Sequence, residues 1–261
     1  MAKTVVITGA SSGIGRALAR AWGRRSATIV LSARDGDALA RVARDVEADG
    51  GVAIVHPGDV TREADRVGLV ERARTETGRL DVLVNSAGRG HYGSVARIGT
   101  TDLEALFALN VFAPLRLAQL AIDPLTRSSG TIVMLSSVAG VVASPRMGAY
   151  AASKFALEAL SMTLRAELGG TGVRVVVIRP GPVDTPFRDN AVTTDGHAGV
   201  RPPGARAQTA EEVAAQTLLA VDRGRAVTET TAFVRVASAA ARVTPGAFRW
   251  LSGVMAARSS K

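Results

Sequence analysis

Short runs rich in valine and isoleucine alternate with longer amphipathic segments along most of this chain. The apolar runs are Thr4–Thr8, Thr28–Ala33, Val52–His56, Leu80–Asn85, Thr131–Ser136 and Val173–Ile178. Each run is almost continuously apolar, which is typical of strands that are buried on both faces of a parallel sheet. Helical patterns separate them, at about 13–24, 37–48, 62–77, 102–121 and 149–168. The alternation therefore predicts an α/β fold with a doubly wound parallel sheet and right-handed crossovers.

The whole chain, residues 1–261, is expected to form a single domain of the Rossmann type, because α/β domains often reach this length and 47% of the residues are hydrophobic. A helix at about 210–223 and a short strand near Ala226–Thr228 would complete the sheet. The glycine- and proline-rich stretch at about 186–208 is expected to be a substrate lid, with a plain surface loop as the alternative. Residues from about 230 to 261 would form a C-terminal helical extension.

Composition excludes several kinds of site. The chain has no cysteine, which excludes disulfides, thiolate metal sites and thiol nucleophiles, and no metal site is expected. The net charge of +9 comes almost entirely from scattered arginines, since Lys3, Lys154 and Lys261 are the only lysines. Because the basic residues form no block, nucleic-acid binding is not expected. The first residues lack a signal-peptide core, which predicts a cytoplasmic protein.

A glycine-rich turn lies where the first predicted strand meets the first predicted helix. Glycines at this spacing let the chain turn sharply and admit a pyrophosphate against bare backbone, while the helix amino end offers N–H groups. Glycine also punctuates ordinary turns, so it is the position between strand and helix that makes the motif informative. The expected dinucleotide contacts are Gly9, Ser11, Ser12, Gly13, Ile14 and Gly15.

The second predicted strand ends at Ala33-Arg34, where a dinucleotide fold places the residue that reads the adenosine ribose. Arg34 can pair with a 2′-phosphate through two hydrogen bonds, whereas an acidic residue would repel it. NADP is therefore the expected cofactor. Asp35 follows directly and could take the ribose instead, which keeps NAD as the alternative.

Polar residues also follow the third and fourth predicted strands, at the sheet edge where ligands bind open α/β folds. Asp59 could accept the adenine amino group, or it could cap the helix that starts near Thr61. The further cofactor contacts expected at this edge are Asp59, Val60, Asn85, Ala87 and Gly88.

Tyr150 and Lys154 stand four residues apart in a helical segment, so both project from one face. A neighbouring ammonium would lower the phenol pKa and make Tyr150 a workable proton donor or acceptor. The alternative is an exposed tyrosine beside a solvated lysine. Ser137 closes the fifth apolar run and could hydrogen-bond a substrate oxygen, whereas Ser136 should point the other way.

In order and in spacing, residues 3–228 resemble the short-chain dehydrogenase/reductase family. The markers are Gly9, Gly13, Gly15, Asp59, Asn85-Ser86-Ala87-Gly88, Asn110, Ser137, Tyr150-x-x-x-Lys154 and Pro180-Gly181-x-Val183-x-Thr185. Two departures are visible. Ser86 stands where members commonly have asparagine, and Ser12 stands where some NADP-using members carry a basic residue, which leaves the phosphate preference to Arg34 alone.

The resemblance implies a catalytic tetrad of Asn110, Ser137, Tyr150 and Lys154. Ser137 would hold the substrate oxygen, Tyr150 would exchange its proton, and Lys154 would bind the nicotinamide ribose. Asn110, on the predicted helix Asp102–Ala121, would anchor a water that relays protons to Lys154. Taken without the family, Asn110 is equally well a satisfied core amide.

The resemblance also implies a nicotinamide seat formed by Pro180, Gly181, the Val183 backbone and the Thr185 hydroxyl. The activity it implies is NADP(H)-preferring oxidation and reduction between a ketone and a secondary alcohol, or an aldehyde and a primary alcohol. The residues expected on the substrate side are Arg89-Gly90-His91-Tyr92-Gly93, Ser144-Pro145-Arg146-Met147 and Phe187. Their mixture of aromatic, methionine and polar groups suggests a moderately apolar substrate.

Two other function classes stay open: a non-catalytic dinucleotide-binding sensor, and a membrane-surface scaffold. A sensor would be expected to lack Tyr150 or Lys154, and both are present. The C-terminal stretch Phe233–Ala257 carries regularly spaced arginines among apolar residues, which predicts two amphipathic helices. These would cover a substrate pocket, form a subunit contact in a homo-oligomeric dimer or tetramer, or lie on a membrane surface.

Overall fold

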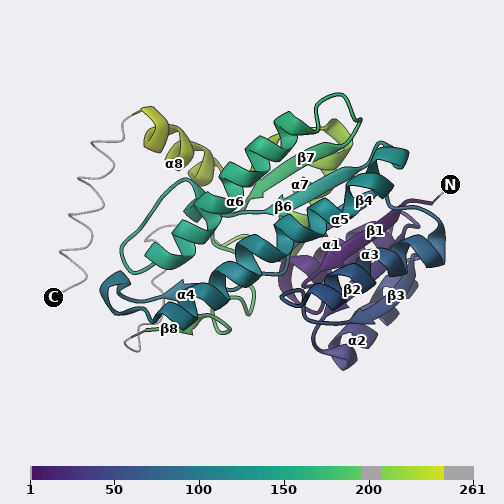
Figure 1. Cartoon of the computed structure of the whole chain (residues 1–261), viewed down its shortest axis with the longest axis horizontal. Coiled ribbons are helices and arrows are strands. Elements are labelled where there is room, and N and C mark those ends of the chain that lie inside the picture. The colour runs from purple at the N-terminus through teal and green to yellow at the C-terminus, as the bar shows by residue number, and fades with distance from the viewer. Residues whose placement is uncertain (1, 195–206, 244–261) are drawn as a thin grey trace.

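A seven-stranded parallel sheet forms the centre of the molecule, with the strand order β3-β2-β1-β4-β6-β7-β9 (Figure 1). The computed structural model describes residues 2–194 and 207–243. The strands are β1 Thr4–Thr8, β2 Thr28–Ala33, β3 Val52–Pro57, β4 Val82–Asn85, β6 Thr131–Leu135, β7 Arg174–Arg179 and β9 Val227–Glu229. Strand order reverses between β1 and β4, and the carboxyl ends of the strands next to such a switch point form the ligand crevice of doubly wound sheets. The predicted fold class is confirmed.

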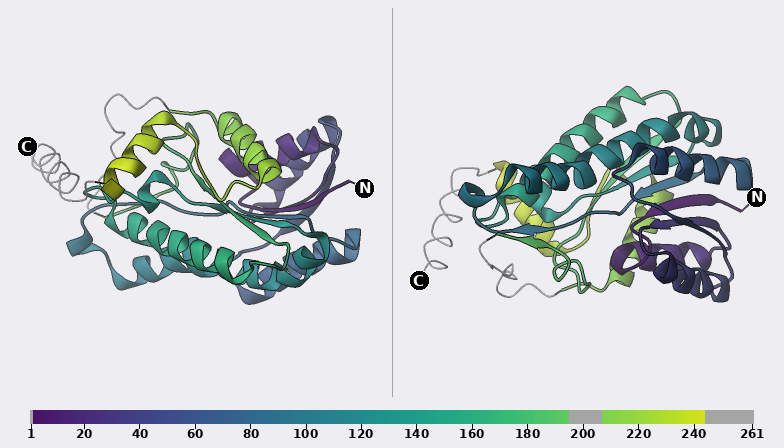
Figure 2. Two further views of the ribbon diagram at one scale, coloured as in Figure 1. Left: turned by 90° about the horizontal axis from the view of Figure 1, so that it is seen from above. Right: turned by 60° about the horizontal axis from the view of Figure 1, so that its bottom comes forward.

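Helices cover both faces of the sheet (Figure 2). One layer holds α1 Gly13–Gly23, α2 Gly36–Ala48 and α7 Ala210–Arg223, which share one apolar core with the sheet. The other layer holds α3 Glu63–Thr77, α4 Thr100–Phe107, α5 Ala113–Ser128 and α6 Gly148–Glu167, of which α3, α5 and α6 supply most of the second core. Strand side chains alternate between the two cores, as the continuously apolar runs require. The boundaries predicted for most of these elements agree to within a few residues.

The helix predicted over 102–121 is wrong as a single element. It is divided into α4 and α5 by a π-helical turn, η2 Ala108–Phe112, and it continues to Ser128. A π turn inserts one residue into the helical repeat, and such turns recur at functional sites. The inserted turn carries Asn110, which is buried.

The segment Thr100–Ser128 is long and apolar enough to span a membrane by length and composition. Its apolar residues are instead explained by the fold, because Leu117, Ala118, Ala121 and Leu125 of α5 lie in the core beneath the sheet. The helix therefore has the hydropathy of a core helix in an α/β sandwich.

A second, two-stranded sheet lies beyond the carboxyl edge and was not predicted. It pairs β5 His91–Tyr92 with β8 Val192–Thr193 in parallel. Two-residue strands carry no hydrophobic period, so their sequence gives no signal. The pairing ties the segment after β4 to the segment that follows β7.

The two predicted peripheral segments are described only in part. Of the lid expected at 186–208, residues 195–206 lie outside the described residues. Of the C-terminal extension, the first helix is α8 Ala232–Val243, and the second expected helix falls on residues outside the description. Short 3-10 turns, η1 Val95–Arg97 and η3 Val138–Gly140, complete the elements.

Candidate active site

The glycine turn between β1 and α1 is a cradle of bare backbone. Gly9 and Gly13 have φ values of +65° and +51°, which residues other than glycine rarely adopt. A Cβ atom on Gly15 would lie 2.2 Å from the Gly9 carbonyl oxygen, so only glycine allows this approach. Ser12 is the N-cap of α1 but makes no side-chain hydrogen bond to the helix. The first N–H groups of α1 are therefore not capped by that side chain, which is the condition for binding a phosphate.

Arg34 and Asp35, the two residues that could read the adenosine ribose, differ in their engagement. Asp35 is the N-cap of α2, and its carboxylate accepts a hydrogen bond from the Ala38 N–H at 2.9 Å. Arg34 is exposed at the end of β2 and forms no salt bridge within the described part of the chain. The arginine is thus the group presented to a ligand at this edge.

Asp59 lies at the same edge, and its carboxylate is held by a local turn. It accepts hydrogen bonds from the Thr61 N–H and hydroxyl at 2.9 and 2.8 Å. Burial raises the pKa of Asp59, but the bonds from Thr61 and the charges of Arg34 and Arg62 outweigh it and lower the pKa overall. The alternative that Asp59 caps the helix near Thr61 is wrong, because α3 begins at Glu63 with Arg62 as its N-cap.

At the end of β4 the chain again approaches with bare backbone. The Thr8 hydroxyl accepts hydrogen bonds from the Ser86 and Ala87 N–H groups, both at 3.1 Å, and so fixes this turn to β1. A Cβ atom on Gly88 would lie 3.3 Å from the Asn110 side-chain oxygen and 3.7 Å from the Lys154 Nζ atom. Gly88 therefore lies where the edge of β4 meets two residues of the predicted tetrad.

The Asn85 side chain is buried at the same position. Its amide nitrogen approaches the Met134 sulfur at 3.4 Å, and its Oδ1 atom has no hydrogen-bond partner among the described residues. Buried amide oxygens are normally satisfied, so this acceptor is suited to a donor from a ligand.

Helix α6 brings Tyr150 and Lys154 to one buried face beside Ser137. Lys154 Nζ donates to the Leu135 carbonyl at 2.8 Å and lies 5.8 Å from the centre of the Tyr150 ring. Ser137 follows β6, caps η3 by accepting from the Ala139 N–H, and lies close enough to the Tyr150 phenol to lower its pKa. The alternative of an exposed tyrosine and a solvated lysine is wrong, because both side chains are buried.

Asn110 is both near the site and hydrogen-bonded as a core amide. Its Oδ1 atom accepts from the Arg89 N–H at 2.9 Å, and its Nδ2 atom donates to the Arg89 carbonyl at 2.9 Å and to the Ser153 hydroxyl at 3.1 Å. The π turn in η2 directs this side chain toward the segment after β4. Asn110 thereby fixes the residue that follows Gly88.

The segment after β7 crosses from η3 to the glycine turn. The Pro180 carbonyl accepts from the Val138 N–H at 2.9 Å, and Val183 forms a parallel bridge with Gln208. The Thr185 side chain lies beside Gly13, where a Cβ atom would be 3.2 Å from its Cγ2 atom. The segment predicted to seat a nicotinamide therefore reaches the predicted phosphate cradle at Thr185.

The helix α8 packs against this same segment. A Cβ atom on Gly181 would lie 3.2 Å from Val234 of α8, which is fully buried. The first part of the C-terminal extension is therefore packed on the domain, close to Pro180-Gly181.

A family model described as short chain dehydrogenase matches residues 3–196, most of the chain. The chain belongs to the short-chain dehydrogenase/reductase family. The match covers the glycine turn, the end of β4, and the whole of the Ser137, Tyr150 and Lys154 cluster. The resemblance noted from the sequence is confirmed.

Similar proteins extend this likeness over most of their own length. The ketoacyl reductase HetN of a Nostoc species is 36% identical over 204 residues, which are 77% of this chain and 71% of that protein. The structure of a short-chain dehydrogenase from Sphingobium yanoikuyae in complex with NADPH has a TM-score of 0.77 and 31% identity, covering 99% of this chain and 96% of that one. A short-chain dehydrogenase/reductase of Burkholderia phymatum in complex with NAD has a TM-score of 0.81 and 28% identity, covering 90% and 92%.

The lowered phenol pKa expected in this short-chain dehydrogenase/reductase is wrong. Burial raises the pKa of Tyr150, and the hydrogen bond with Ser137 lowers it only in part, while the Tyr92 phenol raises it further. Burial also lowers the pKa of Lys154 to about 8, against the opposing charge of Glu158. Residue spacing shows that the two groups share a face, but it does not show how dry that face is.

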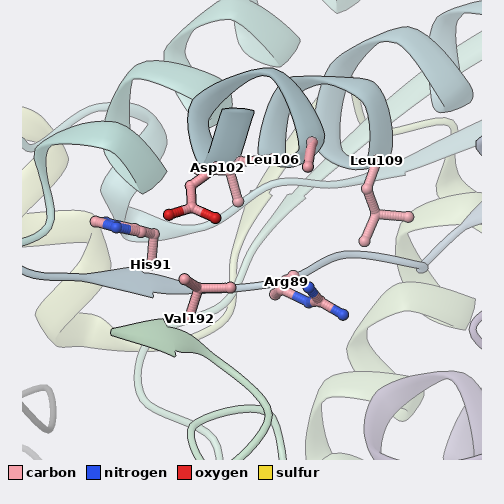
Figure 3. A pocket seen from close by; sticks show the side chains of 7 residues that line it. Arg89, His91, Asp102, Leu106, Leu109 and Val192 are labelled. Atoms are coloured by element: carbon pink, nitrogen blue, oxygen red, sulfur yellow. The ribbon is translucent and has the colours of Figure 1, made fainter. Parts of the chain in front are cut away.

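Aromatic residues surround the Tyr150 side chain. The Phe187 ring lies 5.7 Å from the Tyr150 ring at an angle of 58° and packs over Gly90, where a Cβ atom would be 3.1 Å away. Tyr92 and His91 are successive residues of β5, so their side chains face opposite ways. Tyr92 is near enough to Tyr150 to raise the pKa of its phenol. His91 instead lines a small cavity beneath α4 with Asp102, Leu106 and Val192 (Figure 3). His91 therefore faces away from the predicted substrate side.

Sequence reasoning missed a buried ion network behind the site. Arg179, the last residue of β7, donates from Nε and Nη2 to the two carboxylate oxygens of Glu158, each at 2.9 Å. Its third nitrogen donates to Glu229 of β9 at 2.9 Å. The sequence did contain one indication that Glu158 belongs to this network. Glu158 follows Lys154 by four residues, so it lies on the face of α6 that carries Tyr150.

Proposed function

We propose that this chain is an NADP(H)-preferring oxidoreductase that interconverts a ketone and a secondary alcohol, or an aldehyde and a primary alcohol. The observation that carries the proposal is the burial of the Tyr150 phenol and the Lys154 ammonium beside the half-buried Ser137 at the carboxyl edge of the sheet. That arrangement places a proton donor, its electrostatic partner and a hydrogen-bonding hydroxyl in one dry site.

The residues at the sheet edge fit a nicotinamide dinucleotide. The glycine cradle and the uncapped start of α1 suit its pyrophosphate, and the unpartnered Asn85 oxygen suits a ligand donor. When bound, the dinucleotide supplies or accepts the hydride. The residues proposed to hold it are Gly9, Ser11, Ser12, Gly13, Ile14, Gly15, Arg34, Asp59, Val60, Asn85, Ala87, Gly88, Tyr150, Lys154, Pro180, Gly181, Val183 and Thr185.

The preference for NADP rests on Arg34. Because the Asp35 carboxylate caps α2, it is already engaged, whereas Arg34 is exposed and able to pair with a 2′-phosphate. The Sphingobium relative was solved with NADPH and the Burkholderia relative with NAD, so the family alone does not decide the cofactor.

The proton steps follow from the buried phenol. Because burial raises the pKa of Tyr150, the phenol stays protonated at neutral pH and is ready to donate to an oxygen that gains negative charge. Ser137 would hold that oxygen, and Lys154 would stabilise the tyrosinate that remains. The Asn110 oxygen accepts one bond from Arg89, and its second lone pair is proposed to hold a water toward Lys154.

The substrate is proposed to be moderately apolar. Tyr150 packs in a small apolar cluster with Ala139, Ala151, Met147 and Phe187, so a ligand that reaches the phenol must contact apolar groups. Since the Phe187 ring packs against the Tyr150 ring, the part of the expected substrate lid that includes Phe187 is proposed to cover the Tyr150 phenol. A carbonyl substrate agrees with the name of the HetN relative, a ketoacyl reductase.

The test is a spectrophotometric screen of ketones and alcohols with NADPH and NADH, with Tyr150→Phe beside the native protein. The native protein should turn over at least one ketone and prefer NADPH. The variant should bind NADPH, as shown by quenching of tryptophan fluorescence, and lose turnover. Undiminished turnover by the variant would overturn the assignment of Tyr150.

Self-association is proposed through the layer that holds α6. Phe155 and Met162 are 43% and 63% exposed and lie seven residues apart, hence on one face of α6, while Phe112 of the neighbouring η2 is 58% exposed. Light scattering should show a dimer or tetramer that Met162→Lys weakens. A native protein that is monomeric at assay concentration would contradict this proposal.

A further inference from the structure

Three buried charges and one partly exposed charge lie between the catalytic face of α6 and the edge strand β9. Lys154, Glu158 and Arg179 are 5%, 7% and 3% exposed. Arg179 binds both oxygens of Glu158 and reaches Glu229 on β9, so one guanidinium joins three elements. The two positive and two negative charges cancel.

The stability of the fold does not by itself explain why this many charges are buried. The loss of hydration when an ion pair is buried costs roughly as much free energy as the attraction between the charges returns, and apolar replacements are often as stable. Arg179 also directly precedes Pro180, at the start of the segment proposed to seat the nicotinamide. The network therefore lies between the two parts of the proposed site.

Several charged and titratable groups lie on α6 or on the elements that pack against it. They are Asp102 and Glu104 of α4, His91 and Tyr92 of β5, Arg174 and Arg179 of β7, and Tyr150, Glu158, Arg165 and Glu167 of α6 itself. Arg165 donates to the backbone carbonyls of Val175 and Ala226. Among the described groups, Glu158 is the one whose charge raises the pKa of Lys154.

We infer that Glu158, held in place by Arg179, is a positioning residue whose fixed negative charge keeps Lys154 protonated in a site that excludes water. The bidentate contact with Arg179 prevents Glu158 from turning toward solvent, and Glu158 follows Lys154 by one helical turn on the same buried face of α6. Arg179 thus acts through Glu158. The inference rests on the proposed function only for its effect on turnover.

The lysine count makes a direct test practical, since the chain has only Lys3, Lys154 and Lys261. Protein labelled with ¹³C at lysine Cε should give three NMR signals, assigned by Lys3→Arg and Lys261→Arg. In the native protein without cofactor, one signal should titrate near pH 8, as burial of Lys154 requires. Because the measurement uses neither substrate nor cofactor, its outcome is independent of the proposed reaction.

Glu158→Gln should lower the Lys154 pKa measurably, since it removes the negative charge that opposes the effect of burial on that pKa. The matched control is Glu167→Gln, an exposed glutamate on the same helix, which should leave the titration unchanged. If Glu158→Gln does not fold, Glu158→Asp keeps the charge but withdraws it by one methylene, and a smaller fall is expected.

Kinetics then separates positioning from simple structural support. The pH profile of kcat should move to lower pH in Glu158→Gln, while NADPH binding at low pH stays close to native. A folded Glu158→Gln variant, or failing that a folded Glu158→Asp variant, in which Lys154 titrates as in the native protein would overturn the inference.

Discussion

Replacing Lys154 by methionine should stabilise the fold at neutral pH while removing activity. The fall of the Lys154 pKa from 10.5 to about 8 corresponds to about 3 kcal/mol spent on keeping the buried ammonium charged. Methionine is similar in length and carries no charge, but it loses the hydrogen bond to the Leu135 carbonyl, worth about 1 kcal/mol. The expected net gain at pH 7 is therefore about 2 kcal/mol.

The pH dependence gives the sharper test. Below pH 8 the lysine is protonated in both the folded and the unfolded chain, so the cost of burial is fully present. Between about 8 and 10.5 the unfolded chain binds more protons, so the free energy of unfolding of the native protein rises with pH. Above that window both forms are neutral and the cost is gone.

Urea denaturation followed by circular dichroism across this pH range measures the effect. The native free energy of unfolding should rise relative to Lys154→Met by about 3 kcal/mol between pH 8 and 10.5. A difference that stays flat across this range would refute the claim that Lys154 is charged and buried at a cost.

Three further outcomes are expected. Arg34→Ser should weaken NADPH binding by roughly tenfold or more and leave NADH binding unchanged, because only the 2′-phosphate contact is lost; equal losses for both would contradict this. Gly15→Ala should abolish NADPH binding measured by calorimetry, since its Cβ would lie 2.2 Å from the Gly9 carbonyl oxygen. Phe187→Ala should raise kcat/KM for bulky ketones relative to small ones by roughly tenfold, because the ring over Tyr150 is removed; an unchanged ratio would remove Phe187 from the substrate side.

The sheet and most helices were predictable because each element carries its own signal. A continuously apolar run is enough to predict a doubly buried strand, and the helix predicted over 210–223 is α7 Ala210–Arg223. The break at Asn110 was not predictable, because it depends on hydrogen bonds to the backbone of Arg89, which approaches only in the folded chain.

The residues of the candidate site were predictable from the sequence, but their burial and its effect on their pKa values were not. Spacing placed Tyr150 and Lys154 on one face, and strand ends placed Ser137 beside them. The direction of the Tyr150 pKa was predicted wrongly, because burial depends on Phe187 and other residues distant in sequence. The ion pair between Glu158 and Arg179 was not predictable for the same reason, because the two residues are distant in sequence and come together only when β7 packs against α6.

Isotope transfer tests the central claim most directly. NADPH that carries deuterium in place of the transferable hydrogen at C4 of the nicotinamide is incubated with a ketone found in the substrate screen, and the alcohol is analysed by mass spectrometry. We expect deuterium at the carbinol carbon with the native protein and none above background with Tyr150→Phe. An alcohol formed without the label, or labelled equally well by the variant, would contradict hydride transfer assisted by this phenol.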